Sequence, residues 1–287
     1  MILQDTYTLA NGVEIPKLGL GTWMISNDEV GQAVVDAIAL GYRHIDTAQA
    51  YQNEVGVGKG IRAAGIPREQ IFVTTKLAAE IKDYDGAVAA IDGSLEALGL
   101  DVIDLMIIHS PQPWMAYGDD EDRCFEGNRE AWRALEDAYE AGKLRAIGLS
   151  NFKEADLDNI LASARVNPMV NQVLAHIGNT PFELIEHAAS KGLLTEAYSP
   201  IAHGALLGHD TVSAMAEKYG VSVPQLSIRY TLQLGLLPLP KTANPAHMAS
   251  NAALDFEISD TDMATLKGLS VTDYGEANLF PVFGGKL

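Results

Sequence analysis

Cysteine is nearly absent from this sequence of 287 residues, which contains only Cys124. A single thiol excludes an intramolecular disulfide framework and any zinc site built on several cysteines. The residues around Cys124 do not form the setting of a low-pKa nucleophilic thiol. A chain of this length can bury enough apolar surface to fold without disulfides or a structural metal. We therefore expect no metal site.

Long apolar runs are also lacking. No run reaches the roughly 18 residues of a membrane span. Met1 is followed by mixed sequence rather than by the apolar centre of a signal peptide. We therefore predict a cytoplasmic protein that has no membrane partner.

Basic residues are scarce. The chain has 20 Lys and Arg against 38 Asp and Glu, a formal net charge of −18, and its pI is about 4.6. Because nucleic-acid binding requires a basic surface that displaces counterions, a nucleic-acid partner is excluded. The same charge repels anionic cofactors and substrates unless basic side chains lie close to their binding sites.

Several familiar site motifs are incomplete. Residues 56–60 are glycine-rich, but they lack the Gly-Lys-Ser/Thr of a phosphate loop and its preceding strand. We interpret them as the start of a helix whose glycines allow close packing. Residues 19–21 lack the third glycine of a dinucleotide fingerprint, and no Gly-x-Ser-x-Gly elbow occurs. Five histidines lack metal-ligand spacing and are predicted to be surface or rim residues: His44, His176, His187, His203 and His209.

The pattern that is present begins with a hairpin and continues as a regular alternation. Asn11-Gly12 between two short extended runs predicts a tight turn with positive φ at both central residues. Short apolar runs rich in Val, Ile and Leu then alternate with helix-length segments. The runs span residues 18–21, 43–46, 71–75, 102–108, 145–149, 169–173, 194–198 and 236–239.

The segments between these runs carry the spacing and the end signals of helices. One apolar stripe is formed by Val30, Val34, Ala37 and Ile38, and two further stripes lie at residues 88–98 and 132–139. Asn27-Asp28 is predicted to cap the first helix. Glycines typical of helix C-termini stand before the next strand at four places: Gly41, Gly99, Gly142 and Gly192.

Eight strands, each followed by a helix, predict an α/β fold, a (β/α)8 TIM barrel that spans residues 1–287 as a single domain. The N-terminal β-hairpin precedes the barrel. Residues 271–287 contain Tyr274, Phe280 and Phe283, which are too many aromatics for a disordered end. We expect this C-terminal tail to fold over the mouth of the active site as a lid.

Polar side chains stand where seven of the eight predicted strands end. In a barrel, the active site lies at these C-terminal ends, and burying polar groups there is costly unless they are paired. Any one of them alone would be read as a hydrogen-bonded rim residue. Together they predict a site, and they are Asp46, Lys76, His109, Ser150, Asn151, Gln172, Tyr198, Ser199, Lys241 and Thr242.

The chemistry of the first strand ends points to carbonyl reduction. Asp46 and Lys76 can form a buried ion pair, and Tyr51 follows Asp46 by five residues. An adjacent ammonium group favours the phenolate, so we expect the pKa of Tyr51 to fall. A neutral His109 can donate to the same substrate oxygen. Because the chain offers no obvious nucleophile, the incoming species is interpreted as a hydride, which requires a cofactor.

At this point the sequence resembles the aldo-keto reductase family along essentially its whole length. Its nearest likeness is the microbial branch that includes 2,5-diketogluconate reductase-like enzymes. The motifs that carry the resemblance, in the order and spacing of the family, are GLGTW at residue 19, RHIDTA at 43, YQNE at 51, TKL at 75, IIH at 107, GLSNF at 148, NQV at 171, AYSP at 197 and PKT at 240.

The resemblance implies a catalytic tetrad of Asp46, Tyr51, Lys76 and His109, in which Tyr51 is the general acid. It implies an extended nicotinamide cofactor, NADPH, with NADH possibly also accepted. The family positions that contact this cofactor fall on Thr22, Asp46, Ser150, Asn151, Gln172, Tyr198, Ser199, Ile201, Lys241, Thr242, His247 and Asn251.

Two of these positions depart from the family. His247 replaces the usual arginine at the 2′-phosphate, and Ser250 replaces the usual acid before Asn251. Histidine is mostly neutral at pH 7 and cannot form the bidentate contact of a guanidinium. We therefore expect weaker discrimination against NADH than in most relatives.

The substrate is predicted to be a small aldehyde or ketone. Ser110 stands where the family often has tryptophan after the catalytic histidine, which is expected to open that wall. The predicted substrate residues are Trp23, Tyr51, His109, Ser110 and Trp114. Residues 111–127 form a long loop with an acidic, solvated tip at 118–122, which disfavours strongly anionic sugar acids.

We predict a monomer.

Three alternatives stay open at this stage. Lys76 can be the Schiff-base nucleophile of an aldolase barrel, which borohydride trapping of an adduct would reveal. The chain can instead be a cofactor-binding module that senses redox state without turnover. Finally, the strand-end residues can be packing residues of an inactive barrel.

Overall fold

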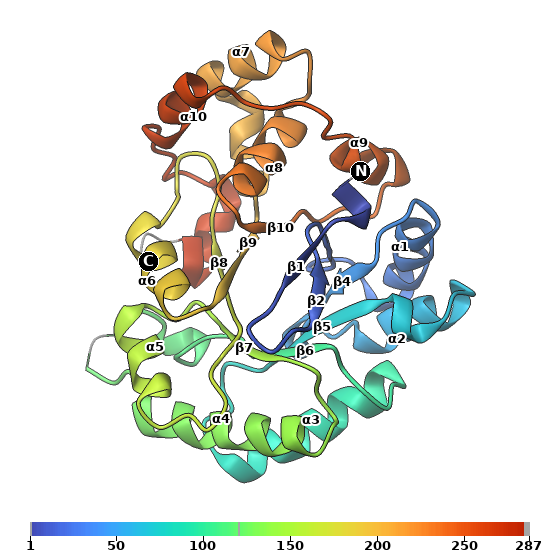
Figure 1. The fold of residues 1–287 in the computed structure, drawn as a ribbon, viewed down its shortest axis with the longest axis vertical. Helices are drawn as coiled ribbons and strands as arrows, with labels where there is room; N and C mark the ends of the chain where they lie inside the picture. Colours follow the sequence, from blue (N-terminus) through green and yellow to red (C-terminus); the bar gives the residue numbers. More distant parts are fainter. Residues whose placement is uncertain (1, 120, 284–287) are drawn as a thin grey trace.

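The computed structural model describes residues 2–119 and 121–283. In this part of the chain, an eight-stranded parallel sheet runs in the order β3-β4-β5-β6-β7-β8-β9-β10 (Figure 1). The sheet closes on itself because Gly21 pairs with Lys241, and the Gly19 amide donates to the Pro238 carbonyl at 3.2 Å. The predicted (β/α)8 barrel is therefore confirmed.

The strands agree with the predicted apolar runs to within a few residues at each end. They are β3 (Leu20–Gly21), β4 (His44–Asp46), β5 (Phe72–Leu77), β6 (Leu105–Ile108), β7 (Ile147–Ser150), β8 (Val170–Leu174), β9 (Leu194–Tyr198) and β10 (Leu237–Leu239). Nearly all of their residues are buried, as expected for parallel strands covered by helices.

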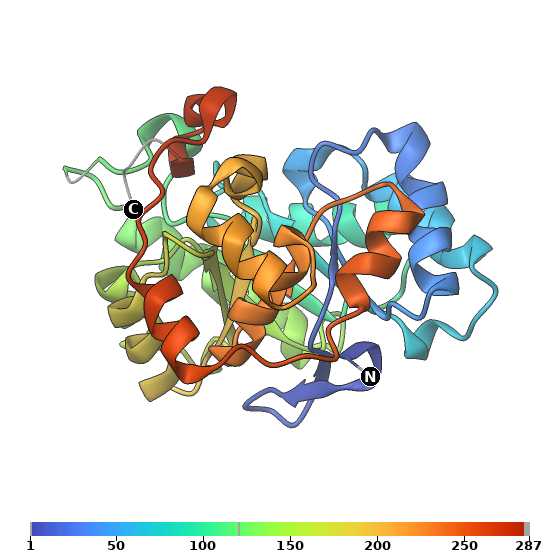
Figure 2. The ribbon, with the colours of Figure 1, turned by 90° about the horizontal axis from the view of Figure 1, so that it is seen from above.

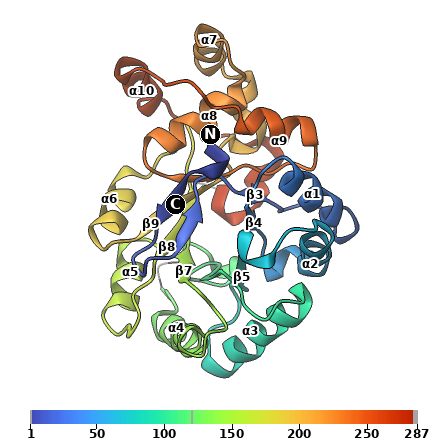
Figure 3. The same ribbon diagram turned by 45° about the vertical axis from the view of Figure 1, so that its right-hand side comes forward.

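The helices follow one another around the barrel, and Figure 3 shows α1 to α6 in sequence order about the strands. Their bounds are α1 (Asn27–Ala39), α2 (Glu54–Ala63), α3 (Tyr84–Leu98), α4 (Phe125–Glu140), α5 (Glu154–Leu161), α6 (Phe182–Ser190), α7 (Asp210–Lys218), α8 (Val223–Gln233), α9 (Pro245–Ala252) and α10 (Asp260–Lys267). Each predicted apolar stripe lies on the face that packs on the core.

The N-terminal hairpin is confirmed, but its turn differs from the predicted one. Strands β1 (Thr6–Thr8) and β2 (Glu14–Pro16) pair antiparallel, and the Leu9 amide donates to the Val13 carbonyl. Three residues therefore separate the pair, and among the described residues of this turn only Gly12 has positive φ, at +85°. The loop is thus the three-residue hairpin type whose last residue is a left-handed glycine, here Gly12. Asn11 needs no positive φ in such a loop.

The glycines of residues 56–60 serve helix packing, as predicted. A Cβ at Gly58 would lie 1.9 Å from the Leu98 carbonyl oxygen at the end of α3. At Gly60 it would lie 2.5 Å from the Gly31 carbonyl oxygen of α1. Such distances are far inside van der Waals contact, so only glycine allows α2 to approach both neighbouring helices this closely.

The helix ends are partly as predicted. Four glycines at helix C-termini all have positive φ: Gly41, Gly99, Gly142 and Gly192. The predicted cap of α1 is wrong, because Ser26 is the N-cap residue and Asn27 already belongs to the helix. The Asn27 Oδ1 atom instead accepts from the Gly56 amide at 2.8 Å, so this side chain joins α1 to α2.

Two regions go beyond the eight simple strand–helix units. The connection from β9 to β10 contains η5 (Ala202–Gly208) and two helices, α7 and α8. Helix α10 follows α9 and is joined to α7 by the ion pair of Lys218 with Asp262. After α10, the tail forms η6 (Gly275–Leu279) and η7 (Pro281–Phe283).

No helix in the described ranges is long and apolar enough to cross a membrane.

The tail and the hairpin lie at opposite ends of the barrel (Figure 2). The hairpin is tied to the N-terminal ends of the strands, since Asn11 donates to the Arg145 carbonyl at 2.9 Å. The Phe283 ring is 2% exposed and lies 6.4 Å from Trp23 and 4.5 Å from His203, centroid to centroid. The tail therefore folds over the end of the barrel where the strands terminate, as predicted up to residue 283. Residues 284–287 lie outside the described part.

Candidate active site

A buried ion pair lies at the C-terminal ends of two adjacent strands. Lys76 Nζ of β5 is 2.6 Å from Asp46 Oδ1 of β4, and the two side chains are 1% and 5% exposed. Lys76 also donates to the Thr47 carbonyl at 2.8 Å. The predicted pair is therefore present, and its ammonium group is held by two oxygens from one neighbouring chain segment.

Tyr51 is brought to this pair by a short turn. It closes η2 (Gln49–Tyr51), directly after β4, and Gln52 ends the turn with a φ of +54°. Asn53 fixes the segment, because its Oδ1 accepts from the Thr47 hydroxyl at 2.6 Å. As a result, Lys76 Nζ lies 4.9 Å from the centroid of the Tyr51 ring.

The pKa values of Lys76 and Tyr51 reflect competing effects. Burial lowers the pKa of Lys76, but the charges of Asp46 and Tyr51 outweigh it and raise the pKa above the ordinary value. Burial also raises the pKa of the Tyr51 phenol, while the Lys76 charge and hydrogen bond act against burial without cancelling it. The predicted fall in the pKa of Tyr51 is therefore wrong, because the sequence pattern does not reveal how strongly the ring is desolvated.

His109 completes the group on the next strand end. Its ring centroid is 5.7 Å from that of Tyr51, and the ring is 7% exposed. Burial lowers the pKa of His109 well below its usual range, and the charges of Lys76 and Lys82 add to this effect. The imidazole is therefore neutral at pH 7, as predicted, and can donate a hydrogen bond.

The wall beside His109 agrees with the prediction at Trp114 but differs from it at Ser110. Ser110 has no exposed surface, and its carbonyl accepts from Lys82 Nζ at 2.8 Å, so a substrate cannot reach it in this structure. Trp114, in η4 (Trp114–Ala116), lies edge-on to His109 with ring centroids 5.1 Å apart. The wall that Ser110 leaves open is thus covered by a tryptophan four residues later.

Beside His109, three side chains, those of Ser150, Asn151 and Tyr198, join in one hydrogen-bond network with two backbone carbonyl groups. Tyr198 of β9 donates to Asn151 Oδ1 at 2.7 Å, and Asn151 Nδ2 donates to the His109 carbonyl at 3.0 Å. Ser150 of β7 donates to the Gln172 carbonyl at 2.8 Å. Amide, hydroxyl and aromatic groups thus lie together beside the tetrad, and these are kinds of group that can contact a planar ring and a carboxamide.

The comparison with known proteins gives the family. The model of the Aldo/keto reductase family matches residues 17–271 of this chain. The chain belongs to the aldo/keto reductase family. Glyoxal reductase of Bacillus subtilis (strain 168) is 42% identical over 270 residues, covering 93% of this chain and 94% of the relative.

Solved structures agree with this assignment. An aldo-keto reductase from a Medee basin deep-sea metagenome library has a TM-score of 0.86 and is 35% identical, covering 92% of this chain and 94% of that one. A Bombyx mori aldo-keto reductase in complex with NADP has a TM-score of 0.82 and is 35% identical, covering 97% and 98% of the two chains. The protein is thus an oxidoreductase with a nicotinamide cofactor and a carbonyl substrate.

The remaining predicted cofactor residues of this reductase lie in three places: beside Asp46, after β9 and after β10. Thr22 is buried and donates to the Asp46 carbonyl at 2.8 Å. Ser199 lies at the end of β9 with a φ of +50°, and Ile201 precedes η5. The last four residues lie after β10: Lys241 and Thr242 in its loop, and His247 and Asn251 on α9. Lys241 and His247 are exposed, whereas Asn251 is buried.

Two buried carboxyl groups beside the tetrad were missed by the sequence reasoning. Glu54, at the start of α2, accepts from the Thr75 hydroxyl at 2.6 Å, and burial raises its pKa. Glu196, in the middle of β9, accepts from Gln172 Nε2 at 2.7 Å. The available signal for Glu196 was a lone acidic residue inside a strand that has no other charged side chain.

The histidines differ from the prediction at two positions. His44 and His176 are fully buried, with burial lowering the pKa of each, to about 3 and about 4. Their bonds to Thr74 and Tyr274 make them core residues rather than rim residues. No group of three potential metal ligands occurs within residues 2–119 and 121–283.

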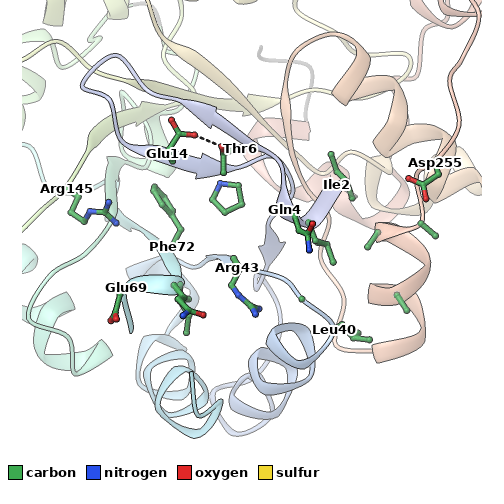
Figure 4. A pocket seen from close by; sticks show the side chains of 18 residues that line it. Ile2, Gln4, Thr6, Glu14, Leu40, Arg43, Glu69, Phe72, Arg145 and Asp255 are labelled. Carbon is green, nitrogen blue, oxygen red and sulfur yellow. Dashed lines mark hydrogen bonds between the residues drawn. The ribbon is translucent and has the colours of Figure 1, made fainter. Parts of the chain in front are cut away.

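A large groove lies at the far end of the reductase barrel from the tetrad. Its volume is about 860 Å³, and Figure 4 shows that Arg43, Phe72, Arg145 and the hairpin residue Glu14 line it. Arg43 and Phe72 flank the N-terminal ends of β4 and β5, whereas catalytic groups of barrel enzymes stand at the opposite ends. The groove is therefore separate from the candidate active site.

Proposed function

We propose that this reductase transfers a hydride from a nicotinamide cofactor to the carbonyl carbon of neutral aldehydes and ketones, with Tyr51 donating the proton. The observation that carries the proposal is the cluster of a phenol, a buried ammonium–carboxylate pair and a neutral imidazole at adjacent strand ends. The phenol can donate a proton to a carbonyl oxygen, while the ammonium group and the imidazole lie close enough to assist that transfer.

The proton movement follows from the charges. Since burial raises the pKa of Tyr51, the phenol carries its proton at pH 7 and is ready to act as an acid. As the proton leaves, the neighbouring Lys76 ammonium stabilises the developing phenolate. His109 donates to the same carbonyl oxygen and orients it, and Asp46 keeps Lys76 charged. When bound, a reduced nicotinamide would supply the hydride, so the product would be an alcohol, and Tyr51 would regain its proton from solvent.

Ser150 and Asn151 of the network beside the tetrad, together with Gln172, would hold the carboxamide of this cofactor, with the Tyr198 ring against the nicotinamide. Ser199 and Ile201 would contact the pyrophosphate, and Thr22 would contribute its loop backbone. Lys241, Thr242 and His247 would meet the adenosine 2′-phosphate, and Asn251 would meet the adenine. We propose NADPH as the preferred cofactor with NADH also used, because Lys241 remains and His247 replaces an arginine.

The rim of the mouth favours neutral, apolar carbonyl compounds. Large apolar side chains are exposed on loops that follow the barrel strands and on the tail, at Met24, Met115, Leu207, Leu279 and Phe280. Three acidic residues at the loop tip are exposed and repel anions: Asp119, Glu121 and Asp122. Asp120 lies outside the described residues. The relative named glyoxal reductase supports a reactive aldehyde, in agreement with this rim.

The aldolase alternative is disfavoured by the state of Lys76. A Schiff-base lysine must be a neutral amine, usually by desolvation without a counter-ion. Lys76 instead contacts Asp46 and has a raised pKa. The ammonium form therefore prevails at pH 7.

We also propose that residues 1–287 act as a single domain and as a monomer in the cytoplasm. The single cysteine suits a reducing compartment. Light scattering coupled to gel filtration measures the oligomeric state directly, and a dimer mass would contradict the monomer.

The test is a panel of neutral aldehydes and ketones with both cofactors, followed by the absorbance of the reduced nicotinamide. Tyr51→Phe is expected to lower kcat at least about a hundredfold, because a general acid contributes that much, while cofactor Kd stays within about threefold. Tyr139→Phe, on α4 and remote from the site, is the matched control. If no carbonyl compound gives Tyr51-dependent oxidation of the cofactor, the proposed function is wrong.

A further inference from the structure

Glu196 stands in the barrel interior behind the tetrad and does not belong to the cluster that carries the proposed proton transfer. It is fully buried, and its Oε2 accepts from Gln172 Nε2 at 2.7 Å. The same Nε2 donates to Asp46 Oδ2 at 2.9 Å, and Asp46 Oδ1 contacts Lys76. A continuous chain of short contacts therefore joins Glu196 to the ammonium group beside Tyr51.

The amide of Gln172 has only one orientation that suits these contacts. Its nitrogen carries two hydrogens and gives one to each carboxyl group, which leaves Oε1 as the acceptor end of the amide. Removing either carboxyl group would remove one of the two hydrogen bonds that hold this orientation. Glu196 is thus positioned to control the side chain that we propose binds the cofactor carboxamide.

The charge balance of this interior does not suit two anions. Among the buried residues that the structure describes, Lys76 is the only lysine or arginine. It already has Asp46 as its partner, and the second Glu196 oxygen, Oε1, is buried without a hydrogen bond. If Glu196 were ionised, its buried carboxylate would have one neutral donor at Oε2 and no hydrogen bond at Oε1. Burying a charge with so few partners is strongly unfavourable.

The groups that face Glu196 from the neighbouring elements can be named. Across the barrel, the charges of Asp46 on β4 and Lys76 on β5 both affect the pKa of Glu196. Beyond them, Tyr51 and Glu54 face Lys76. Of its strand neighbours, β8 contributes Gln172, and β10 (Leu237–Leu239) has no titratable side chain. Burial raises the pKa of Glu196 to about 8, the charge of Asp46 adds to this, and Gln172 and Lys76 act against it.

We infer that Glu196 is a positioning residue which, as a neutral carboxyl group, fixes the Gln172 amide against Asp46 and leaves Lys76 with a single anionic partner. This role rests on the proposed function of the tetrad. When Glu196 ionises, the second negative charge raises the pKa of Tyr51 further and makes it a weaker acid. Reduction is therefore expected to slow as Glu196 loses its proton.

The first test is infrared spectroscopy of the protein without added cofactor, comparing wild type with Glu196→Gln. The difference spectrum at pH 7 is expected to show the C=O band of a carboxylic acid, and this band should vanish as the pH is raised through about 8. Glu54→Gln is the matched control, since Glu54 is another buried carboxyl group near Lys76. No acid band assignable to Glu196 would overturn the inference.

The second test is the pH profile of kcat for carbonyl reduction. Wild type is expected to lose activity in a one-proton step near pH 8 and to level off at a lower kcat above it, because ionised Glu196 weakens Tyr51 as an acid without removing it, and Glu196→Gln should lack this step. A step that persists unchanged in Glu196→Gln would overturn the inference. If that variant does not fold, Gln172→Met must shift both the acid band and the step, and unchanged values would overturn the inference. The infrared result stands even if Tyr51-dependent turnover is never found, so the two proposals fail separately.

Discussion

His247 illustrates how a single residue can alter cofactor choice. It is exposed on the first turn of α9, whose N-cap Asn244 accepts from the Ala246 amide at 2.9 Å. A helix N-terminus favours anions, and Lys241 lies on the loop before it. The arrangement suits a phosphate group, but an imidazole cannot form the bidentate contact that a guanidinium makes with a phosphate.

We predict that His247→Arg raises the ratio of kcat/KM for NADPH over NADH by about tenfold to a hundredfold, the value of one charge-assisted contact. His247→Gln is the control, because it keeps a polar side chain without adding charge. The ratio is measured with one aldehyde at fixed ionic strength. A wild-type preference for NADPH above about a thousandfold would contradict the premise that discrimination is weak.

At the scale of elements, the packing of α2 depends on the absence of side chains. The Cβ that Gly58→Ala adds would overlap the Leu98 carbonyl oxygen, which is backbone and cannot rotate away. We predict that this variant lowers the free energy of unfolding by about 3 kcal/mol or more, as overpacking against a fixed wall does. Urea unfolding measures it.

Gly93→Ala is the matched control for this prediction. Gly93 lies inside α3, and nothing stands within 4 Å of its added Cβ. Alanine is a better helix former than glycine, so this variant should gain about 0.5–1 kcal/mol. Equal effects of the two substitutions would show that helix propensity, rather than the contact of α2 with α3, decides the outcome at residue 58.

Element existence was predictable, while several local details were not. The alternation of apolar runs and helical stripes is a short-range signal, and all eight barrel strands follow it. The cap of α1 was assigned one residue too late because Ser26 and Asn27 are both good caps by type. The contact of Asn27 with Gly56 of another helix decides between them, and it joins residues that are far apart in the sequence.

For the whole molecule, buried neutral histidines set a limit on acid stability. His176 donates to the Ile177 carbonyl and accepts from Tyr274 of the tail, with burial lowering its pKa to about 4. The unfolded chain binds this proton near pH 6.5, so stability is full above pH 6.5 and falls as the pH drops towards 4.

We predict that His176 alone accounts for a loss of about 2 kcal/mol in the free energy of unfolding between pH 7.5 and pH 5, from the linkage relation. Urea unfolding at the two pH values, for wild type and His176→Gln, measures the difference in slope. His187→Gln, at a partly exposed histidine on α6, is the control and should keep the wild-type slope. Identical slopes for wild type and His176→Gln would contradict the prediction.

The sequence alone determined the barrel, its order of strands and the polar groups at the strand ends. Periodicity is a local property, and the C-terminal ends of parallel strands must meet at one rim. Asp46, Lys76 and His109 could therefore be placed together without coordinates.

Only the tertiary structure decided how these groups are surrounded. Burial reversed the expected direction of the pKa shift of Tyr51, Trp114 covered the wall beside Ser110, and β8 and β9 brought Gln172 and Glu196 to Asp46. Desolvation and unpaired charge depend on every segment that packs around a group. Those segments are distant in the sequence, so no local pattern records their combined effect.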